Sequence, residues 1–164
     1  MPRIVVTGLG AVTSLGNDPL SFWEGMKEGR SGAHRREFAD YPDFPVAIAC
    51  EVQDFEPADW MDARQARRLS RASQFSLATA KQALEDADLD LSTEDPSRIG
   101  VAFNTGGGGM TSISDGEKML SSRGPRAVSP FIAPNAMPNC VASLISIDLG
   151  LTGPVITSAL ACAS

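Results

Sequence analysis

The stretch that decides the fold is GPVITSALACAS, residues 153–164. Its first half, Pro154 to Ala159, is rich in β-branched and small apolar residues, and we expect it to form a strand buried on both faces. The chain then reaches Cys162 among small neighbours that allow a sharp turn. A residue just past the carboxyl end of a parallel strand lies at the functional edge of an α/β sheet. If a helix begins directly after Cys162, its free N–H groups and dipole favour the thiolate over the thiol.

Two more segments predict buried strands, Arg3–Thr7 and Arg98–Phe103, and a turn should follow the first at Gly8-Leu9-Gly10. A further candidate strand is Val46–Val52, in an otherwise irregular segment. Helices are expected at Asn17–Gly29, 62–87, 111–120 and 138–149. Asn17-Asp18-Pro19 should supply the N-cap of the first, and Gly29 and Gly150 should stop the first and the last. The segment with prolines at 125, 130, 134 and 138 is expected to be a loop. Strands that alternate with helices indicate a layered α/β fold with a largely parallel sheet.

Neither glycine motif matches a nucleotide-binding loop. Gly8-Leu9-Gly10 lacks the third glycine of a dinucleotide fingerprint, because position 13 is Thr13. The run Gly106–Gly109 is not followed by the Lys and Ser/Thr that a phosphate-binding loop requires. A flexible turn at a strand end explains this run equally well.

The composition is that of an ordinary globular chain. Of 164 residues, 43% are hydrophobic and 21% are charged, and the formal net charge is −6. This acidic balance argues against a nucleic-acid partner, because neutralising phosphates requires a surplus of Lys and Arg on the contact face. The apolar stretch 140–161 is interrupted by an aspartate, two glycines and a proline, so it does not predict a membrane span.

Three cysteines, Cys50, Cys140 and Cys162, stand at wide spacings without a secretory leader. An odd number at these spacings fits reduced thiols in the cytoplasm better than a disulfide framework, and none is spaced to hold zinc. We therefore expect a soluble intracellular protein. Around Cys162, local composition alone favours a small buried hydrophobe over a reactive thiol.

Four arginines follow a helical spacing within the predicted helix 62–87. They are Arg64, Arg67, Arg68 and Arg71, which this spacing places on one helix face. Against a net charge of −6, the cluster is a local reversal of sign. A solvated face with surface ion pairs explains the pattern as well as an acidic partner does.

Several short motifs recur in a fixed order along the chain: Ile4–Gly10, Arg98–Gly100, Ser129–Phe131, Gly153–Pro154 and Ala161–Ser164. Together they resemble the β-ketoacyl-acyl carrier protein synthases, most closely synthase II of fatty acid synthesis. The resemblance implies a thiolase-like layered fold (αβαβα). It identifies residues 1–164 as an incomplete N-terminal part of a ketoacyl synthase, ending just after the nucleophile motif. One departure is Leu160, where the family usually carries Thr or Ser, and it concerns the packing behind the nucleophile.

By this resemblance Cys162 is the acyl-accepting nucleophile. An acyl group moves from the phosphopantetheine thioester of acyl carrier protein to the cysteine, and decarboxylation of malonyl carrier supplies the carbanion that attacks the acyl-enzyme. The resemblance implies no other cofactor and no metal. It assigns carrier docking to Arg64, Arg67 and Arg68, with Arg71 as a weaker candidate, and it implies a homodimer.

The resemblance places the acyl pocket at Gly107 and Ile132. In synthase II enzymes a bulky residue commonly occupies the position that matches Gly107, so its absence here predicts tolerance of longer acyl chains. Ile132 matches a segment that reaches the pocket of the partner subunit.

The one histidine, His34, lies in a basic turn far upstream of the cysteine, and we expect it to be a solvated loop residue. In the family, two histidines and a lysine that follow the cysteine stabilise the negative charge that develops during condensation, so we expect the 164 residues alone to be inactive. We also expect them to be poorly soluble, because sheet edges and apolar surface would be left uncovered. Two alternatives stay open. One is a polyketide ketosynthase, and the other is a non-catalytic carrier-binding or dimerisation subunit, against which the retention of Cys162 speaks.

Overall fold

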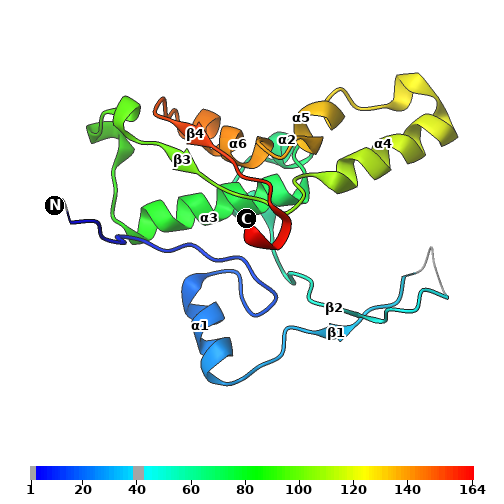
Figure 1. The fold of residues 1–164 in the computed structure, drawn as a ribbon, viewed down its shortest axis with the longest axis horizontal. Helices are drawn as coiled ribbons and strands as arrows, with labels where there is room; N and C mark the ends of the chain where they lie inside the picture. The colour runs from blue at the N-terminus through cyan, green and yellow to red at the C-terminus, as the bar shows by residue number, and fades with distance from the viewer. Residues whose placement is uncertain (1–2, 39–42) are drawn as a thin grey trace.

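The computed structural model describes residues 3–38 and 43–164, in which helices accompany two separate two-stranded sheets (Figure 1). Its helices are α1 (Pro19–Lys27), α2 (Ala63–Ala66), α3 (Arg71–Asp86), α4 (Met110–Arg123), α5 (Ile132–Ala136) and α6 (Cys140–Asp148). Its strands are β1 (His34–Arg35), β2 (Ile48–Ala49), β3 (Val101–Ala102) and β4 (Val155–Ile156). Single 3-10 turns cover Pro57–Asp59, Leu91–Thr93, Pro96–Arg98, Pro125–Ala127 and Ala161–Ala163. This mixture of elements is consistent with the predicted α/β class.

Helix α3 packs against α6 and against the N-terminal segment. Ser70 caps its N-terminus, because Ser70 Oγ accepts a hydrogen bond from the Ser73 amide at 3.2 Å. The buried face of α3 carries small side chains, among them Ser73, Ser76 and Ala78, which let α6 approach closely. Ser76 Oγ donates to the Ser73 carbonyl at 2.9 Å and lies 3.4 Å from the Val141 carbonyl of α6, so this buried hydroxyl is satisfied.

Strands β3 and β4 pair in parallel, as predicted for these two segments. The amide of Val101 donates to the Pro154 carbonyl at 2.8 Å, and that of Thr105 donates to the Ser158 carbonyl at 3.1 Å, so the pairing extends beyond both short strands. Helix α6 packs against both strands and against α3 (Figure 1). The main apolar cluster forms there and contains Val101, Ala142, Ile145 and Leu151. The carboxyl ends of the two strands therefore meet at one edge.

The N-terminal run Arg3–Thr7 is not a strand, contrary to the prediction. Ile4 is 94% exposed and Val6 is 81% exposed. A β-branched run forms a strand only where a neighbouring strand supplies backbone partners. Among the described residues, no strand pairs with this run.

The segment Gly8–Ala11 lies against α3, and the turn predicted there is absent. A Cβ atom at Gly8 or Gly10 would overlap the backbone of α3. The amide of Ala11 donates to the side chain of buried Gln82 at 2.8 Å, which fixes the segment on the helix. The glycine pair is thus required by close packing.

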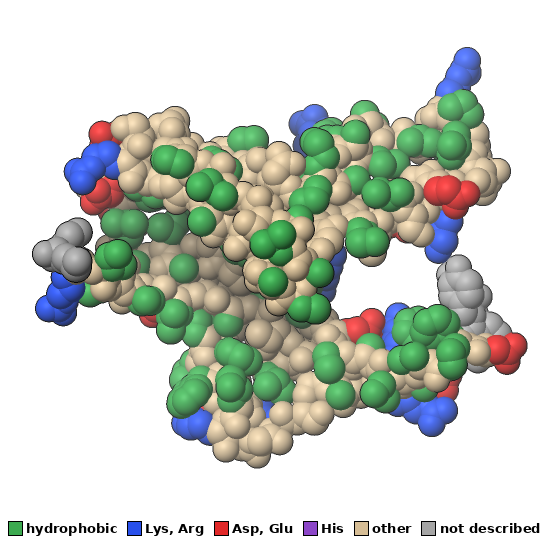
Figure 2. All heavy atoms as spheres, in the orientation of Figure 1, with side chains coloured by type: hydrophobic (Ala, Val, Ile, Leu, Met, Phe, Trp, Pro, Cys, Tyr) green, Lys and Arg blue, Asp and Glu red, His purple; other side chains and the backbone are tan. Residues whose placement is uncertain are grey.

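Strand β4 forms within the predicted segment, but it is not buried on both faces, so the predicted burial is wrong. Val155 is 41% exposed and Ile156 is 60% exposed. Runs of Val and Ile are typical of strands covered on both faces, but here β4 pairs with β3 alone among the described strands. Apolar side chains are correspondingly visible across the face shown in Figure 2.

The ends of α1, α4 and α6 lie within three residues of the predicted ends. Asp18 caps α1, accepting from the Ser21 amide at 2.9 Å, and Gly29 follows its end with φ +66°. Gly150, with φ +67°, ends α6 as predicted. Helix α4 extends three residues beyond the predicted end at position 120, and α6 begins two residues later than expected.

Strands β1 and β2 form an antiparallel pair with His34 opposite Ala49, which confirms a strand in the centre of the candidate segment 46–52. This pair and α4 project from the same side of the molecule, and an open gap separates them (Figure 2). The segment with the four prolines at 125, 130, 134 and 138, expected to be a loop, contains the short helix α5.

Gln82 provides a test of how the N-terminal segment is attached. Its side-chain amide accepts from the Ala11 amide at 2.8 Å and donates to the Asn17 carbonyl at 2.7 Å. Replacing Gln82 by Ala leaves both partners unpaired, so we expect the free energy of unfolding to fall by about 2–4 kcal/mol in urea denaturation. Glu85→Ala, at an exposed position of the same helix, should change it by less than about 0.5 kcal/mol. Equal stability of the two variants would contradict this attachment.

Candidate active site

Cys162 lies in the 3-10 turn Ala161–Ala163, at the edge where the carboxyl ends of β3 and β4 meet. Its side chain is exposed. Ser164 holds this turn to the end of β3, because its Oγ accepts from the Leu160 amide at 2.7 Å and donates to the Thr105 carbonyl at 2.9 Å. The sheet thus presents a thiol to solvent on a turn with a fixed position, which we call the nucleophile turn.

The exposure of Cys162 bears on whether this residue is a small buried hydrophobe or a reactive thiol. The buried interpretation, which local composition favours, is wrong, because the cysteine is exposed. Cys162 lies inside a 3-10 turn, so the free N–H groups of a following α-helix do not act on it within the described residues. Ala161 adopts φ +51°, a left-handed conformation that costs a non-glycine residue roughly 1–2 kcal/mol. Strained backbone of this kind is concentrated at functional sites.

The glycine run Gly106–Gly109 lies between the nucleophile turn and the start of α4. A Cβ atom at Gly106 would lie 3.6 Å from the Ala161 carbonyl oxygen, an ordinary contact. A Cβ atom at Gly109 would overlap the carbonyl oxygen of Asn135. Close packing on α5 therefore requires glycine at the end of the run, while the beginning of the run faces the cysteine turn.

The space beside Gly107 is partly taken by a neighbouring side chain. A Cβ atom at Gly107 would lie 2.8 Å from the sulfur of Met110, the first residue of α4. Ile132 of α5 packs against Gly116 of α4, because a Cβ atom there would meet the Ile132 side chain. Gly107 and Ile132 thus border the same helix, Gly107 at its beginning and Ile132 near its middle.

The helix predicted over 62–87 is broken, which corrects the assignment of four arginines to one continuous face. Helix α2 ends at Ala66 and α3 begins at Arg71. Asn135 of α5 occupies the break, with Nδ2 donating to the Arg68 carbonyl at 2.5 Å and Oδ1 accepting from the Ser70 amide at 3.3 Å. Sequence reasoning missed Asn135, because its partners lie 67 and 65 residues away and no local pattern marks it.

The arginines of the broken helix have different surroundings. The Arg71 guanidinium lies 4.6 Å from the ring centre of Phe75 and 4.9 Å from that of Phe55, so its charge faces an aromatic pair. The Arg68 guanidinium lies 4.9 Å from the ring centre of Phe131 at the start of α5. Arg64 and Arg67 are exposed on and just after α2. The structure therefore separates Arg71 from the other three.

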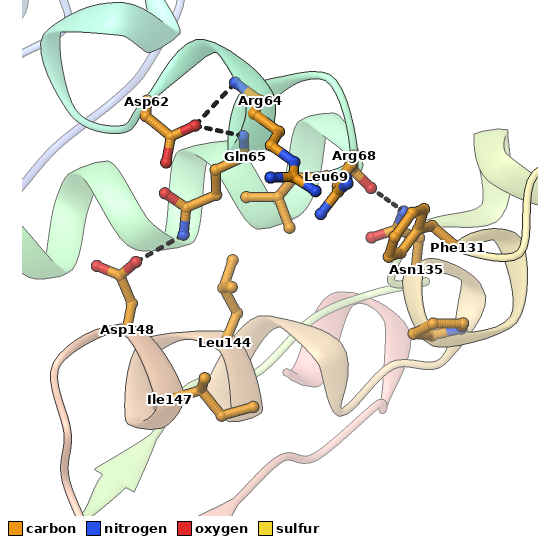
Figure 3. Close-up of a pocket in the computed structure, with 11 residues that line it drawn as sticks. Asp62, Arg64, Gln65, Arg68, Leu69, Phe131, Asn135, Leu144, Ile147 and Asp148 are labelled. Carbon is orange, nitrogen blue, oxygen red and sulfur yellow. Dashed lines mark hydrogen bonds between the residues drawn. The ribbon is translucent and has the colours of Figure 1, made fainter.

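A hollow of about 670 Å³ lies between α2, α5 and α6 (Figure 3). Arg64 and Arg68 lie along one side of this hollow, and Leu144 and Ile147 of α6 lie along the other (Figure 3). The carboxylates of Asp62 and Asp148 also line this hollow, so its polar part is mixed in charge and the two arginines are its cationic groups. Cys162 is not among the residues that line this hollow.

A second hollow of about 280 Å³ lies between the α2–α3 break, α4 and α5. Its lining includes Arg67, Ile132 and Met119, together with Arg68 and Phe131, which also line the first hollow. The arginine that stacks on Phe131 therefore separates two adjacent depressions. The three arginines predicted to dock a carrier are brought together around them.

Asp62 and Asp148 hold α2 in place beside the larger hollow. Asp62 caps α2, accepting at Oδ1 from the amides of Gln65 at 2.9 Å and Arg64 at 2.8 Å. These bonds, foremost that from Gln65, lower the pKa of the Asp62 carboxyl below its ordinary value. Asp148 of α6 accepts from Gln65 Nε2 at 2.6 Å and pairs with Lys81 Nζ of α3 at 3.0 Å, which joins the three helices.

His34 is not in a loop, which corrects one part of that expectation, while its side chain is partly solvated at 38% exposure. It lies in β1, and its Nε2 is 3.2 Å from a carboxylate oxygen of Glu51. The Glu51 carboxylate is also 3.5 Å from the Arg36 guanidinium. The histidine thus belongs to the β1–β2 pair, and none of its hydrogen bonds reaches the nucleophile turn.

Within residues 3–38 and 43–164, no group of three or more His, Cys, Asp or Glu side chains is arranged to hold a metal ion. No helix in that part of the chain is both long and apolar enough to cross a bilayer. Cys50 is exposed, and Cys140 is partly buried with its sulfur 3.4 Å from Ser73 Oγ.

Comparison with known proteins identifies the family. A family model described as "Beta-ketoacyl synthase, N-terminal domain" matches residues 1–164. The chain belongs to this family. The β-ketoacyl synthase fold is also supported by a solved structure titled "The ishigamide ketosynthase/chain length factor", which has a TM-score of 0.83 and 28% sequence identity over 94% of this chain and 39% of that one. The resemblance inferred from the ordered motifs and the thiolase-like fold class are therefore confirmed.

Two curated relatives of this β-ketoacyl synthase domain carry the name 3-oxoacyl-[acyl-carrier-protein] synthase 2. The protein from Staphylococcus aureus (strain COL) is 37% identical over 162 residues, 99% of this chain and 39% of that protein. The protein from Coxiella burnetii (strain RSA 493 / Nine Mile phase I) is 39% identical over 160 residues, 98% of this chain and 39% of that protein. The chain thus spans about two fifths of the length of these relatives.

The cap of α2 predicts a pH dependence of the arginine segment. Because the folded pKa of Asp62 is lowered, its cap stabilises α2 above the ordinary aspartate pKa, and this stabilisation is lost as the pH falls through the lowered value. We expect the Gln65 amide resonance in NMR to titrate with a midpoint below that of an ordinary aspartate. Asp62→Asn, which keeps a capping oxygen without a titrating proton, should remove the transition. A midpoint at or above the ordinary value would contradict the cap.

Proposed function

We propose that the protein containing this chain is a β-ketoacyl-acyl carrier protein synthase of fatty acid synthesis, with Cys162 as the acyl acceptor. The observation that carries the proposal is an exposed cysteine on a strained turn at the carboxyl ends of two parallel strands. The names of the curated relatives support the reaction and the carrier. We propose that the substrates are carried on phosphopantetheine, that no other cofactor is needed, and that the reaction takes place in the cytoplasm.

In the first step, the Cys162 thiolate attacks the carbonyl carbon of the acyl thioester on the carrier. The new C–S bond forms as the bond to the pantetheine sulfur breaks, and that sulfur leaves as a thiolate. In the second step, malonyl carrier loses CO₂, and the resulting carbanion attacks the acyl-enzyme carbonyl. The β-ketoacyl carrier leaves with a new C–C bond, and the Cys162 thiolate is regenerated.

In this reaction, the chain supplies the nucleophile Cys162 and the residues that fix its position. Ser164 and Thr105 fix the turn, and Ala161 directs the backbone so that the thiol is exposed. Condensation also needs donors for the developing thioester enolate. His34, the one histidine of the sequence, is occupied with Glu51 in the β1–β2 pair. We therefore propose that the 164 residues alone do not carry out condensation.

Carrier docking is proposed at Arg64, Arg67 and Arg68. These side chains surround the two adjacent hollows, where a cationic rim borders apolar side chains of α5 and α6. An acidic carrier fits a local positive surface on a chain whose net charge is −6. Arg71 is left out of the proposed docking set, because it lines neither of the two hollows.

The acyl pocket is proposed beside α4, with Gly107 and Ile132 at its border. Met110 covers Gly107 through the flexible end of its side chain, which can move aside when a longer acyl chain enters. The exposed apolar residues of β4, Val155 and Ile156, suit burial in a homodimer. The match to a ketosynthase/chain length factor structure supports a polyketide ketosynthase as the second candidate, which shares this mechanism.

Replacing the nucleophile tests the central assignment. In the intact protein, Cys162→Ser should lower the rate of acyl transfer from carrier by roughly 10³-fold or more, because a hydroxyl without an adjacent base is a poor nucleophile. Transfer is measured as the loss of acyl carrier on a conformation-sensitive gel. Cys50→Ser removes another exposed thiol and should leave the rate unchanged. If transfer persists in Cys162→Ser and is lost in Cys50→Ser, Cys162 is not the acyl acceptor.

Charge reversal tests the docking surface. We expect the triple variant Arg64→Glu, Arg67→Glu, Arg68→Glu to weaken carrier binding by about tenfold or more in fluorescence anisotropy, and the wild-type affinity to fall with added salt. The control is Arg3→Glu, Arg98→Glu, Arg123→Glu, which changes the net charge equally at exposed positions. If both triple variants weaken binding to the same extent, net charge explains the effect and the docking site is wrong.

A further inference from the structure

We propose that Asn135 is a positioning residue that holds Arg68 ready for carrier binding, an inference that rests on the docking function proposed above. Asn135 is partly buried on α5, a helix that is distant in sequence from the arginines. Its side chain bonds to the main chain on both sides of Leu69, inside the α2–α3 break. No family motif quoted above includes this residue.

The amide of Asn135 fits the break in one orientation. Nδ2 donates to the Arg68 carbonyl at 2.5 Å, and Oδ1 accepts from the Ser70 amide at 3.3 Å. With the amide turned over, two donors and two acceptors would face each other. Ser70 is 6% exposed, so its amide has little access to water and depends on this partner.

Contacts with neighbouring elements fix the main chain of Asn135, which restricts the movement of its side chain. Its carbonyl oxygen lies against Gly109, where a Cβ atom would overlap it. The sulfur of Cys140 lies 3.5 Å from the same oxygen, and 3.4 Å from Ser73 Oγ of α3. Helix α5 is therefore clamped between the glycine run, α6 and α3.

Helix α5 holds Arg68 at both ends of the residue. Asn135 bonds its carbonyl, and the Phe131 ring, at the N-terminal end of α5, lies 4.9 Å from its guanidinium carbon. Figure 3 shows these groups together at one end of the larger hollow. An arginine held in this way loses less conformational freedom when a carboxylate binds, and such preorganisation strengthens binding without adding a contact.

The test compares Asn135→Ala with Asn139→Ala in the intact protein. Asn139 is exposed and makes no capping bond at the start of α6, so it is a matched control. We expect Asn135→Ala to increase amide hydrogen exchange at Ser70 and to weaken carrier binding by about three- to tenfold. The rate at which a small neutral reagent labels Cys162 should not change, whereas a general loss of structure would alter it.

Gln74 of α3 offers a second variant that affects the α2–α3 break. Gln74 Nε2 donates to the Ala66 carbonyl at 2.9 Å, at the end of α2. Gln74→Ala should loosen the same break and weaken carrier binding in the same direction, which keeps the inference testable if Asn135→Ala does not fold. Unchanged binding in Gln74→Ala with a loosened break would overturn the inference in that case.

The outcomes separate this inference from the proposed function. If Ser70 exchange increases in Asn135→Ala while carrier binding is unchanged, and charge reversal of the three arginines still weakens binding, then docking stands and the role of Asn135 is wrong. Unchanged Ser70 exchange also overturns the inference. If the wild-type protein does not bind carrier, the docking proposal fails and the role of Asn135 fails with it.

Discussion

The close packing of α3 against its neighbours is the constraint on which the rest of the structure depends. Small side chains on its buried face let α6 approach, and Ser76 satisfies its hydroxyl partly on the α6 backbone. The N-terminal segment comes just as close through Gly8 and Gly10. One helix therefore fixes the position of both the N-terminal segment and the helix that contacts the sheet. Because protein interiors are close-packed, a larger side chain at these points would displace a whole element.

This packing leads directly to the site. Helix α6 contacts both β3 and β4, and the parallel pairing of these strands sets where the nucleophile turn lies. Ser164 then ties the turn to Thr105 at the end of β3. The arginine segment is placed by the same scaffold, because α2 is joined to α6 and α3 through Asp148. Thiol and arginines thus occupy defined positions on one framework.

Local signals in the sequence predicted the features that depend on neighbouring residues. The cap at Asp18 and the glycines after α1 and α6 set helix ends through contacts within a few residues, and these predictions are confirmed. Short apolar runs predicted the two strands and their parallel direction, and the structure shows that they pair with each other. The ordered motifs predicted the family, and the family model matches the whole chain.

Features that depend on distant residues could not be predicted in this way. The α2–α3 break needs Asn135, 67 residues from its partner Arg68, while the local sequence favours one continuous helix. Burial of Arg3–Thr7 and β4 was inferred from composition, but burial depends on which other segments cover a strand. The position of the nucleophile turn likewise depends on a distant residue, because Ser164 donates to the carbonyl of Thr105, 59 residues away.

The most direct test of the central claim is to find which cysteine carries the acyl group. The intact protein is incubated with acyl carrier in the absence of malonyl carrier, digested, and analysed by peptide mass spectrometry. The account predicts that the acyl mass is found on the peptide containing Cys162 and not on those containing Cys50 or Cys140. Cys50 is also exposed, so it controls for simple accessibility. An acyl group on Cys50 with Cys162 unmodified would contradict the account.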